Sequence, residues 1–460
     1  MSDYQLLVIG AGPGGYTAAL RAAKLGLHTA IVERREVGGT CLNRGCIPTK
    51  TLLHASQVYH DAANGASVGV HGALSYDMGE MFAFKRSVSE KLRGGILSLL
   101  KSAKVDVLEG TAQITAPGQV SVTGADGTRT AYTAERILAA TGSVNVRPPI
   151  PGLDLPGVMT SDELLEGTDT PYASIVIIGG GVIGVEFATF YSHLGCRVTL
   201  VEGMANLLPQ LDRELGQNLA QILKKQGVEV LTSAMVRSLE QTGEGLCVHL
   251  EQKGKELTVT GEKVLCAIGR RAYFDGLFAP DLNPALNGKR LLVDEDYRTS
   301  IPGVYAIGDA SAAVQLAHVA AAQGTDCVER MCGSKGSTDL NVIPSCIYSA
   351  PEIAVVGLTE AEAKEQGIPA VSGKCTLFSN ARTIIEDPGR CFMKLVARAD
   401  TQEIIGAQLM CQHASDMISQ LSTAMVNHLT ARQLLSVMRP HPSFEEALSE
   451  AVENLTAKLA

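Results

Sequence analysis

Each of two stretches of this 460-residue chain places three glycines, in the same spacing, between an expected apolar strand and an expected helix. The first, "DYQLLVIGAGPGGYTAALRAAKLGLHTAIVE", has Gly10, Gly12 and Gly15 in G-x-G-x-x-G spacing and Glu33 at the end of the next strand. Gly10 permits a tight turn, Gly12 lets a pyrophosphate approach the backbone, and Gly15 lets helix and strand pack closely. The helix N-terminus would bind the phosphates, and Glu33 would bind ribose hydroxyls. The pattern predicts a nucleotide-binding strand–helix–strand unit; the alternative is a merely glycine-rich turn.

The second stretch, "SIVIIGGGVIGVEFATFYSHLGCRVTLVEG", carries Gly179, Gly181 and Gly184 at the same spacing, followed by Glu202. Two such units predict two nucleotides on one chain. Glu202 would bond a free 2′-hydroxyl and repel a 2′-phosphate, and no arginine lies between it and Pro209 to attract that phosphate. The second nucleotide is therefore expected to be NAD rather than NADP. The alternative for Glu202 is a solvated strand end.

Three further segments end a short apolar strand on a glycine: "LAATGS", "VLCAIGR" and "GVYAIGDA". Ligands of open α/β sheets lie beyond the carboxyl ends of the strands, so these ends are expected to face bound nucleotide. The residues that they would present are Thr141, Gly142, Gly269, Arg270 and Asp309. Asp309 would bond a ribityl hydroxyl. Taken singly, each segment is also compatible with a strand that simply ends in a turn.

Length, charge and hydropathy restrict the remaining choices. The chain is too long for one ordinary core and suggests about two to four domains. Its net charge of −9 opposes binding to nucleic acid or to an anionic membrane surface. The longest apolar stretch, Ser174 to Phe190, contains four glycines and a glutamate and is not expected to span a membrane. Because no export signal precedes the first strand and the eleven cysteines are odd in number, we expect a reducing, cytoplasmic location.

The segment "GTCLNRGCIPTK" places Cys41 and Cys46 five positions apart, with Pro48 in the first turn of an expected helix. A zinc site needs about four ligands, and these cysteines have no partners at a suitable spacing, so no metal site is expected. A reducing cytosol would tend to open a structural disulfide across so small a loop. A helix N-terminus favours the thiolate that attacks disulfides, and a flavin links thiol chemistry to hydride transfer. A redox disulfide is therefore favoured, with FAD bound by the first unit.

Together, "GTCLNRGCIPTK", the two glycine motifs, "YAIGDA", "LAHVAAAQG" and "HPSFEEALSEA" resemble the dihydrolipoamide dehydrogenases, flavoprotein disulfide reductases of the class I pyridine nucleotide-disulfide oxidoreductase family. The likeness covers nearly the whole chain. It implies an α/β fold with two Rossmann-like FAD/NAD(P)-binding domains and a C-terminal α+β dimerisation domain that makes an obligate homodimer. In that interface domain, the alternation in "CFMKLVARAD" predicts an antiparallel sheet half covered by helices. The expected boundaries are 1–147 for the first part of the FAD-binding domain, 148–270 for the NAD-binding domain, 271–343 for the return to the FAD-binding domain and 344–460 for the interface domain.

The resemblance also implies roles for single residues. Cys41 matches the thiol that exchanges with substrate, and Cys46 matches the thiol that contacts the flavin. The motif "HPSFEE" matches the family's His-Pro-Thr-x-x-Glu with Ser443 in place of threonine, and its His-Glu pair would take a proton from the incoming thiol in the partner subunit's site. The implied catalytic group is Cys41, Cys46, Lys50, Glu186, His441 and Glu446, in which Lys50 and Glu186 form an ion pair beside the flavin. Further implied cofactor contacts are Gly39, Thr40, Lys50, Gly110 and Ala317 for FAD and Val236 for NAD.

The implied reaction oxidises protein-bound dihydrolipoyl groups to the disulfide and reduces NAD, through a Cys41–Cys46 disulfide and FAD. Because the first unit starts at residue 4, no fused lipoyl domain is expected. The lipoyl group would arrive on the acyltransferase of a 2-oxoacid dehydrogenase complex or on the carrier protein of glycine cleavage. One departure is Val182, which stands where several NADPH-using relatives carry an aromatic residue, so a more open nicotinamide pocket is expected. The alternatives are another disulfide reductase, an FAD- and NADH-binding subunit without turnover, and a metal-binding scaffold.

Overall fold

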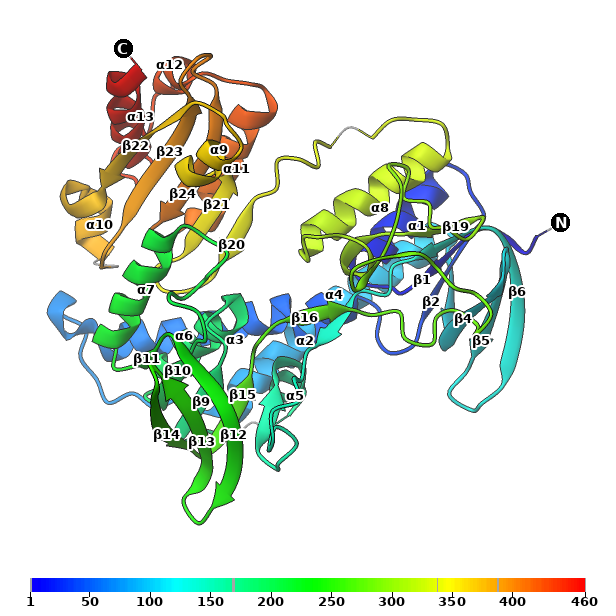
Figure 1. Cartoon of the computed structure of the whole chain (residues 1–460), viewed down its shortest axis with the longest axis horizontal. Coiled ribbons are helices and arrows are strands. Elements are labelled where there is room, and N and C mark those ends of the chain that lie inside the picture. The colour runs from blue at the N-terminus through cyan, green and yellow to red at the C-terminus, as the bar shows by residue number, and fades with distance from the viewer. Residues whose placement is uncertain (1, 168–169, 337, 387–388, 460) are drawn as a thin grey trace.

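The computed structural model describes residues 2–167, 170–336, 338–386 and 389–459, which form three units around separate sheets (Figure 1). The sheet of the first unit has the order β3-β2-β1-β6-β5-β4, with β19 also paired to β6. The carboxyl half of β6 runs parallel to β1 and β19, whereas its amino half pairs antiparallel with β5. The strands are β1 (Tyr4–Ile9), β2 (Thr29–Glu33), β3 (Asp106–Glu109), β4 (Thr111–Ala116), β5 (Gln119–Thr123), β6 (Arg129–Ala139) and β19 (Val304–Ala306).

Two helices far apart in sequence pack together on this first sheet: α1 (Pro13–Lys24) and α8 (Ala317–Met331). The two helices approach closely where Gly324 faces Gly14. A Cβ on Gly324 would lie only 2.5 Å from the carbonyl oxygen of Gly14, so glycine permits this contact. The chain therefore returns to its first unit after the second is complete. The expected boundary residues themselves stay a prediction.

The segment around Cys41 and Cys46 folds as two helices separated by Gly45, rather than as a turn followed by one helix. Cys41 lies inside α2 (Gly39–Arg44), and Cys46 is the first residue of α3 (Cys46–Ala63). The long helix α4 (Met78–Ser102) packs beside α3. Buried Leu52 on α3 belongs to the same apolar core as Phe187 and Phe190 of the second unit. Helix α3 of the first unit therefore packs against the second unit.

The second unit is a parallel sheet of order β11-β10-β9-β15-β8. All five residues of β9 are buried, as expected for a parallel strand covered on both faces. A separate antiparallel sheet, β12-β13-β14, packs on one face of this parallel sheet, because its buried side chains share a core with those of β9 and β15 (Figure 1). The elements are β8 (Val158–Thr160), α5 (Ser161–Glu166), β9 (Ser174–Ile178), α6 (Val182–His193), β10 (Arg197–Val201), α7 (Arg213–Lys225), β11 (Glu229–Leu231), β12 (Ala234–Thr242), β13 (Gly245–Gln252), β14 (Lys255–Gly261) and β15 (Lys263–Cys266).

The third unit is an antiparallel sheet of order β20-β21-β24-β23-β22, with α11 and α13 packed on it. The segment expected to be a strand from its alternation is β23 (Phe392–Arg398), so that prediction is confirmed. Its other elements are β20 (Ser345–Ile347), β21 (Ile353–Gly357), α9 (Glu360–Glu365), β22 (Ala370–Thr376), α10 (Ala381–Glu386), β24 (Ile404–Met410), α11 (Ala414–Val426), α12 (Ala431–Leu435) and α13 (Glu446–Leu459). The α/β class with a C-terminal α+β domain is therefore confirmed.

A short antiparallel pair links the first two units: β7 (Ser143–Asn145) with β16 (Arg270–Ala272). It joins the strand that leaves the first unit to the strand that returns from the second. The Arg270 guanidinium fastens this link, because it donates to Ser143 and Asn145 and forms an ion pair with Asp162 at 3.1 Å. Another two-stranded ribbon, β17 (Leu286–Asn287) with β18 (Arg290–Leu291), lies in the return segment.

Candidate active site

The two glycine motifs have the same geometry at the carboxyl ends of β1 and β9. A Cβ on Gly15 would lie 1.8 Å from the carbonyl oxygen of Gly10, and a Cβ on Gly184 would lie 1.8 Å from that of Gly179. No side chain could be added at either position without moving the backbone. The third glycine of each motif therefore permits the close helix–strand contact, and it does so identically in both units.

The helices that follow the motifs begin without a side-chain cap. Gly12 and Gly181 are their N-cap residues, and no side chain of the described residues bonds the free N–H groups there. By contrast, α5, α9 and α12 each start with a threonine capping box. No described atom outside its own helix and chain neighbours lies within 4 Å of a Cβ placed on Gly181, and for Gly12 only Gly39 comes that near, at 3.9 Å. Uncapped N–H groups beside open space fit a bound pyrophosphate, so the residues present fit a dinucleotide in each unit.

The acidic residue after each motif has the same partners. Glu33 accepts from the backbone N–H of Ala11 at 2.8 Å, and Glu202 accepts from that of Gly180 at 2.7 Å. A second backbone N–H reaches the other oxygen of each carboxylate, from Arg35 and from Met204. These bonds hold each carboxylate beside its glycine loop, where a nucleotide ribose would lie.

The other FAD contacts expected in the first unit gather at the same edge of the sheet. Gly39 approaches the first motif so closely that a Cβ on it would lie 2.7 Å from Gly12 Cα, and Thr40 is its neighbour on α2. Gly110 donates its N–H to the Glu33 carbonyl at 2.9 Å. Ala317 is the first residue of α8.

The strand-end residues expected to face FAD lie where β6 leaves the first sheet. A Cβ on Gly10 would lie 3.3 Å from Thr141 Cα, and Gly142, at φ 72°, accepts from the Tyr273 N–H. Asp309 accepts from the Ser143 hydroxyl at 2.6 Å. Burial raises the pKa of Asp309, and that hydrogen bond opposes the rise. The structure thus brings the FAD-contact candidates together, while their roles stay predictions.

In the second unit, Gly269 follows β15 at φ 122°, and a Cβ on Gly179 would lie 3.1 Å from the neighbouring Ile268 nitrogen. Val236 is buried in β12, two residues from Ala234, whose N–H donates to the Glu202 carbonyl at 3.0 Å. Arg270 is bound into the link between units, so its guanidinium is already engaged by protein groups.

All eleven cysteines of the chain are free thiols, Cys41 and Cys46 among them. The two redox candidates are hydrogen-bonded partners with opposite pKa shifts. The bond from Cys41 lowers the pKa of Cys46 to about 7; burial opposes this change and nearby Lys50 adds to it. The same bond, together with burial, raises the pKa of Cys41. The pair is therefore arranged so that Cys46 carries the thiolate and Cys41 keeps its proton.

An ion pair beside this dithiol joins all three units. Lys50 Nζ on α3 lies 2.9 and 2.8 Å from the two carboxylate oxygens of Glu186, which is on α6 and only 3% exposed. Glu186 also accepts from the backbone N–H of Tyr348, which follows β20, and the Lys50 ammonium lies 4.7 Å above the Tyr348 ring. Burial opposes the charge on Lys50, but Glu186 outweighs it and the pKa of Lys50 is raised. A permanent cation is thus held next to Cys46.

Comparison with known proteins agrees with this arrangement. Residues 4–324 match the pyridine nucleotide-disulphide oxidoreductase family, and residues 343–452 match its dimerisation domain. The chain belongs to this family. It is 37% identical to a dihydrolipoyl dehydrogenase of Bacillus subtilis, covering 98% of this chain and 97% of that one, and 36% identical to that of Geobacillus stearothermophilus, covering 98% and 96%.

Solved structures of the family superpose over the whole length. LpdA from Mycobacterium tuberculosis matches with a TM-score of 0.90 at 27% identity, covering 98% of this chain and 99% of that one. The HOCl-induced flavoprotein disulfide reductase RclA from Escherichia coli, solved as a Cu(II) complex, matches with a TM-score of 0.87 at 28% identity and covers both chains fully. As a pyridine nucleotide-disulphide oxidoreductase, the chain is an oxidoreductase that acts on sulfur groups, and the family uses FAD and NAD(P).

In this pyridine nucleotide-disulphide oxidoreductase, the expected His-Glu pair lies in the dimerisation domain. His441 Nδ1 is 2.8 Å from Glu446 Oε1, and the Ser443 N–H donates to the other Glu446 oxygen at 3.0 Å. That backbone bond and His441 lower the pKa of Glu446. The His441 side chain is 75% exposed in the single chain. The carboxylate therefore fixes one ring nitrogen, and the imidazole stays open to a partner.

A largely apolar pocket of about 380 Å³ opens at Cys41. It includes no acidic residue, lysine or arginine among the described residues, and His318 is its one titratable group besides Cys41 and Tyr16. Its lining residues are Pro13, Tyr16, Gly38, Cys41, Leu42, Ile47, Leu92, Ile96, Ala317, His318 and Ala321. Such a wall suits an uncharged hydrocarbon chain that ends in sulfur.

Two residues near the dithiol were not expected from the sequence. Tyr348 supports Glu186 from a unit that no motif connected to the cysteines, so no local signal existed. Arg44 did offer one, because it is a charged residue between Cys41 and Cys46. It is buried, and its Nε donates to Glu166 at 2.7 Å, which anchors α2 to α5.

Proposed function

We propose that this chain is an NAD-dependent dihydrolipoyl dehydrogenase that works as a homodimer. The observation that carries the proposal is the Cys41–Cys46 pair, with its asymmetric pKa shifts, its cation Lys50 and the apolar pocket at Cys41. A dihydrolipoyl group is an uncharged hydrocarbon with two thiols. It matches this pocket better than glutathione, whose charged groups would meet no acidic residue, lysine or arginine in the described lining.

In the proposed reaction, a substrate thiolate attacks Cys41 Sγ of the disulfide form, and the Cys41–Cys46 bond breaks with Cys46 leaving as the thiolate. The second substrate thiol then attacks the substrate sulfur of the mixed disulfide, which releases the cyclic disulfide product and Cys41 as a thiol. Two electrons now reside in the dithiol. Bound FAD supplies the two-electron chemistry that returns the cysteines to the disulfide and reduces the nicotinamide.

The chain's own charged groups each contribute one step. Lys50 stabilises the Cys46 thiolate as leaving group, and Glu186 keeps Lys50 in place and charged. His441, oriented by Glu446, takes the proton of the attacking thiol as a general base. Because His441 is largely exposed in the single chain, we propose that it serves the partner subunit's dithiol.

The exposed apolar side chains of the dimerisation domain support this dimer. Phe378, Ile384, Ile385 and Met438 are all largely exposed in one chain, Met438 at 95%. Such a concentration is expected where a second subunit packs. The lipoyl group is proposed to arrive on a separate carrier protein. In the described ranges, no helix has the length and apolar character needed to cross a membrane.

NAD is preferred over NADP in this proposal because of Glu202, which is 8% exposed and held by two backbone N–H groups. A 2′-phosphate placed there would meet a fixed carboxylate. The test is the initial rate of NADH formation by the FAD-loaded protein with dihydrolipoamide and NAD, with NADP in a parallel assay. Rapid reduction of NAD alone supports both substrate and cofactor. No turnover with dihydrolipoamide, in a protein that reduces glutathione disulfide, would select the alternative of another disulfide reductase.

A further inference from the structure

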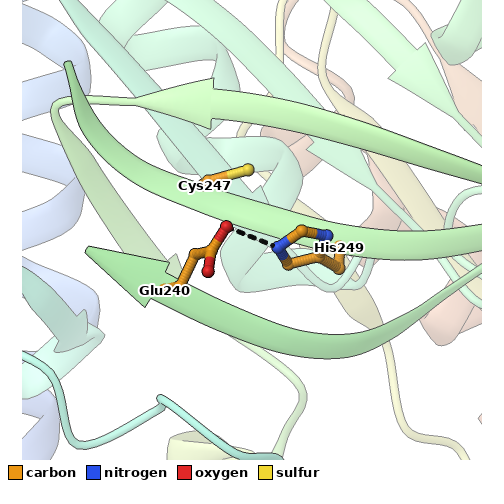
Figure 2. Close-up of side chains that lie close together, drawn as sticks. All are labelled: Glu240, Cys247 and His249. Atoms are coloured by element: carbon orange, nitrogen blue, oxygen red, sulfur yellow. Dashed lines mark hydrogen bonds and ion pairs between the residues drawn. The ribbon is translucent and has the colours of Figure 1, made fainter. Parts of the chain in front are cut away.

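The outer face of the β12-β13-β14 sheet holds three side chains that the proposed reaction does not use: Glu240, Cys247 and His249 (Figure 2). Among the described residues, they form the only group of three or more His, Cys, Asp or Glu side chains whose ligand atoms all lie within 4.8 Å of one another. We propose that Glu240, Cys247 and His249 bind a thiophilic divalent metal ion of the zinc class. This departs from the expectation that the chain has no metal site.

The register of the hairpin places the three residues together. Glu240 on β12 pairs directly with Cys247 on β13, and His249 lies two residues further along β13 on the same face. Directly paired residues have Cβ atoms about 5 Å apart, and residues i and i+2 of a strand point to the same side. β13 is also paired with β14 on its other edge, so its backbone is held from both sides. The sheet therefore fixes the three ligand positions before any ion binds.

A β-bulge between Val236 and Ser238 is essential to this register. Before the bulge, Val236 pairs with Leu250, and both are buried. Continuing that pairing unbroken would set Glu240 opposite buried Leu246, on the core side of the sheet. The bulge shifts the register by one residue and turns the Glu240 carboxylate to the outer face, opposite Cys247.

The donor set selects the class of ion. Thiolate, imidazole and carboxylate are the three ligand types that bind zinc in proteins, whereas calcium and magnesium prefer oxygen alone. Three protein ligands leave the fourth position of a tetrahedral site to solvent. His249 Nε2 already lies 3.0 Å from Glu240 Oε1, so the imidazole and the carboxylate face each other. Both side chains are substantially exposed, which leaves an entry path.

The test uses the full-length, FAD-loaded chain with Cys41→Ser and Cys46→Ser, because the redox dithiol would itself bind zinc. Zn²⁺ is titrated under a thiol-free reductant in competition with a chromogenic chelator. We expect one zinc per chain, with the affinity reduced at least about tenfold by Cys247→Ser or His249→Ala. Cys332→Ser, which removes an exposed thiol just after α8, is the matched control and should leave the affinity unchanged.

X-ray absorption at the zinc edge gives a second measurement, which identifies the ligand atoms and does not depend on a change in zinc affinity. In the chain with Cys41→Ser and Cys46→Ser, which is the background for the other variants, the zinc should show one sulfur neighbour. Cys247→Ser should remove this sulfur neighbour, and Cys332→Ser should keep it. FAD content and the melting temperature without zinc verify that each variant folds. The proposal is overturned if the background protein binds no zinc, if Cys247→Ser and His249→Ala bind it as tightly as the background, or if the sulfur neighbour survives Cys247→Ser.

Discussion

Cys46 is the residue on which the proposed reaction most depends, because it must leave as a thiolate and return its electrons. We expect Cys46→Ser to lower dihydrolipoamide oxidation by at least about a thousandfold, since serine cannot form the disulfide. FAD should stay bound, because the glycine motif of the first unit is unchanged. The measurement is the steady-state rate of NADH formation together with the flavin content. Cys332→Ser is the control and should keep full activity; a normal rate in Cys46→Ser would exclude the mechanism.

The two members of the buried ion pair should shift the pKa of Cys46 in opposite directions. Lys50 lowers the pKa of Cys46 and Glu186 raises it. We therefore expect the midpoint of Cys46 alkylation, near pH 7, to rise by at least about half a pH unit in Lys50→Met and to fall in Glu186→Gln. The thiolate fraction grows as the pH rises through that midpoint, so at fixed neutral pH alkylation slows in the first variant and accelerates in the second.

Residue-resolved mass spectrometry of the reduced protein after brief alkylation measures this pH dependence. Exposed Cys332 in the same samples is the internal control, and its alkylation profile should be the same in all three proteins. If both variants moved the Cys46 midpoint in the same direction, a general loosening of the site would explain the result. The assigned electrostatic roles of Lys50 and Glu186 would then be wrong.

At the scale of elements, the N-termini of α1 and α6 separate a folding role of glycine from a binding role. Gly184→Ala would drive a Cβ to 1.8 Å from a carbonyl oxygen, and we expect it to cost about 3 kcal/mol or more in stability. The Cβ added by Gly181→Ala would have no described atom within 4 Å, so the fold should tolerate this substitution. The new methyl group would, however, occupy the space next to the pyrophosphate. We expect Gly181→Ala to keep the melting temperature and to raise the KM for NAD about tenfold or more.

Thermal unfolding and NAD kinetics on the same preparations distinguish the two effects. Gly195→Ala is not a suitable control, because Gly195 has φ 77° and alanine would be strained there. Gly94→Ala on α4 is suitable, since its Cβ meets no described atom and lies far along the chain from both motifs. Equal losses of stability in Gly181→Ala and Gly184→Ala would contradict the division of roles.

What the sequence could predict follows from how local each signal is. Both nucleotide units were predictable, because the glycine spacing, the apolar strand and the terminal acid all lie within about thirty residues. The separate helix α2 around Cys41 was not, since six residues between glycines carry no clear periodicity. The cluster of Glu240, Cys247 and His249 was also hidden, because it depends on a bulge that changes the strand register, and no spacing rule reveals a bulge.

At the scale of the whole molecule, contacts between distant segments decide the site. Glu186 of the second unit meets Lys50 of the first and the Tyr348 backbone of the third. Lys394 on β23 similarly bridges to Asp212 at the start of α7, at 2.7 Å. Such pairs join residues more than 130 positions apart, so only the resemblance to a family, and no pattern in the chain, implied the Lys50–Glu186 pair. The proposed catalytic group is therefore brought together only when the three units assemble.

The proposed dimer makes the His441 position testable at this same scale. His441→Gln alone should lower turnover by about a hundredfold or more through loss of the general base, and Cys46→Ser alone should be inactive. If His441 serves the partner subunit, a dimer of one chain of each kind contains one complete site, built from the cysteines of the first and the histidine of the second. After equal amounts are unfolded, mixed and refolded with FAD, half of the dimers are mixed, so about one quarter of the wild-type activity should return. Mixing either variant with itself is the control. Recovery no greater than the sum of the two parents would place His441 at its own subunit's dithiol or outside the reaction, because a mixed dimer would then hold no complete site.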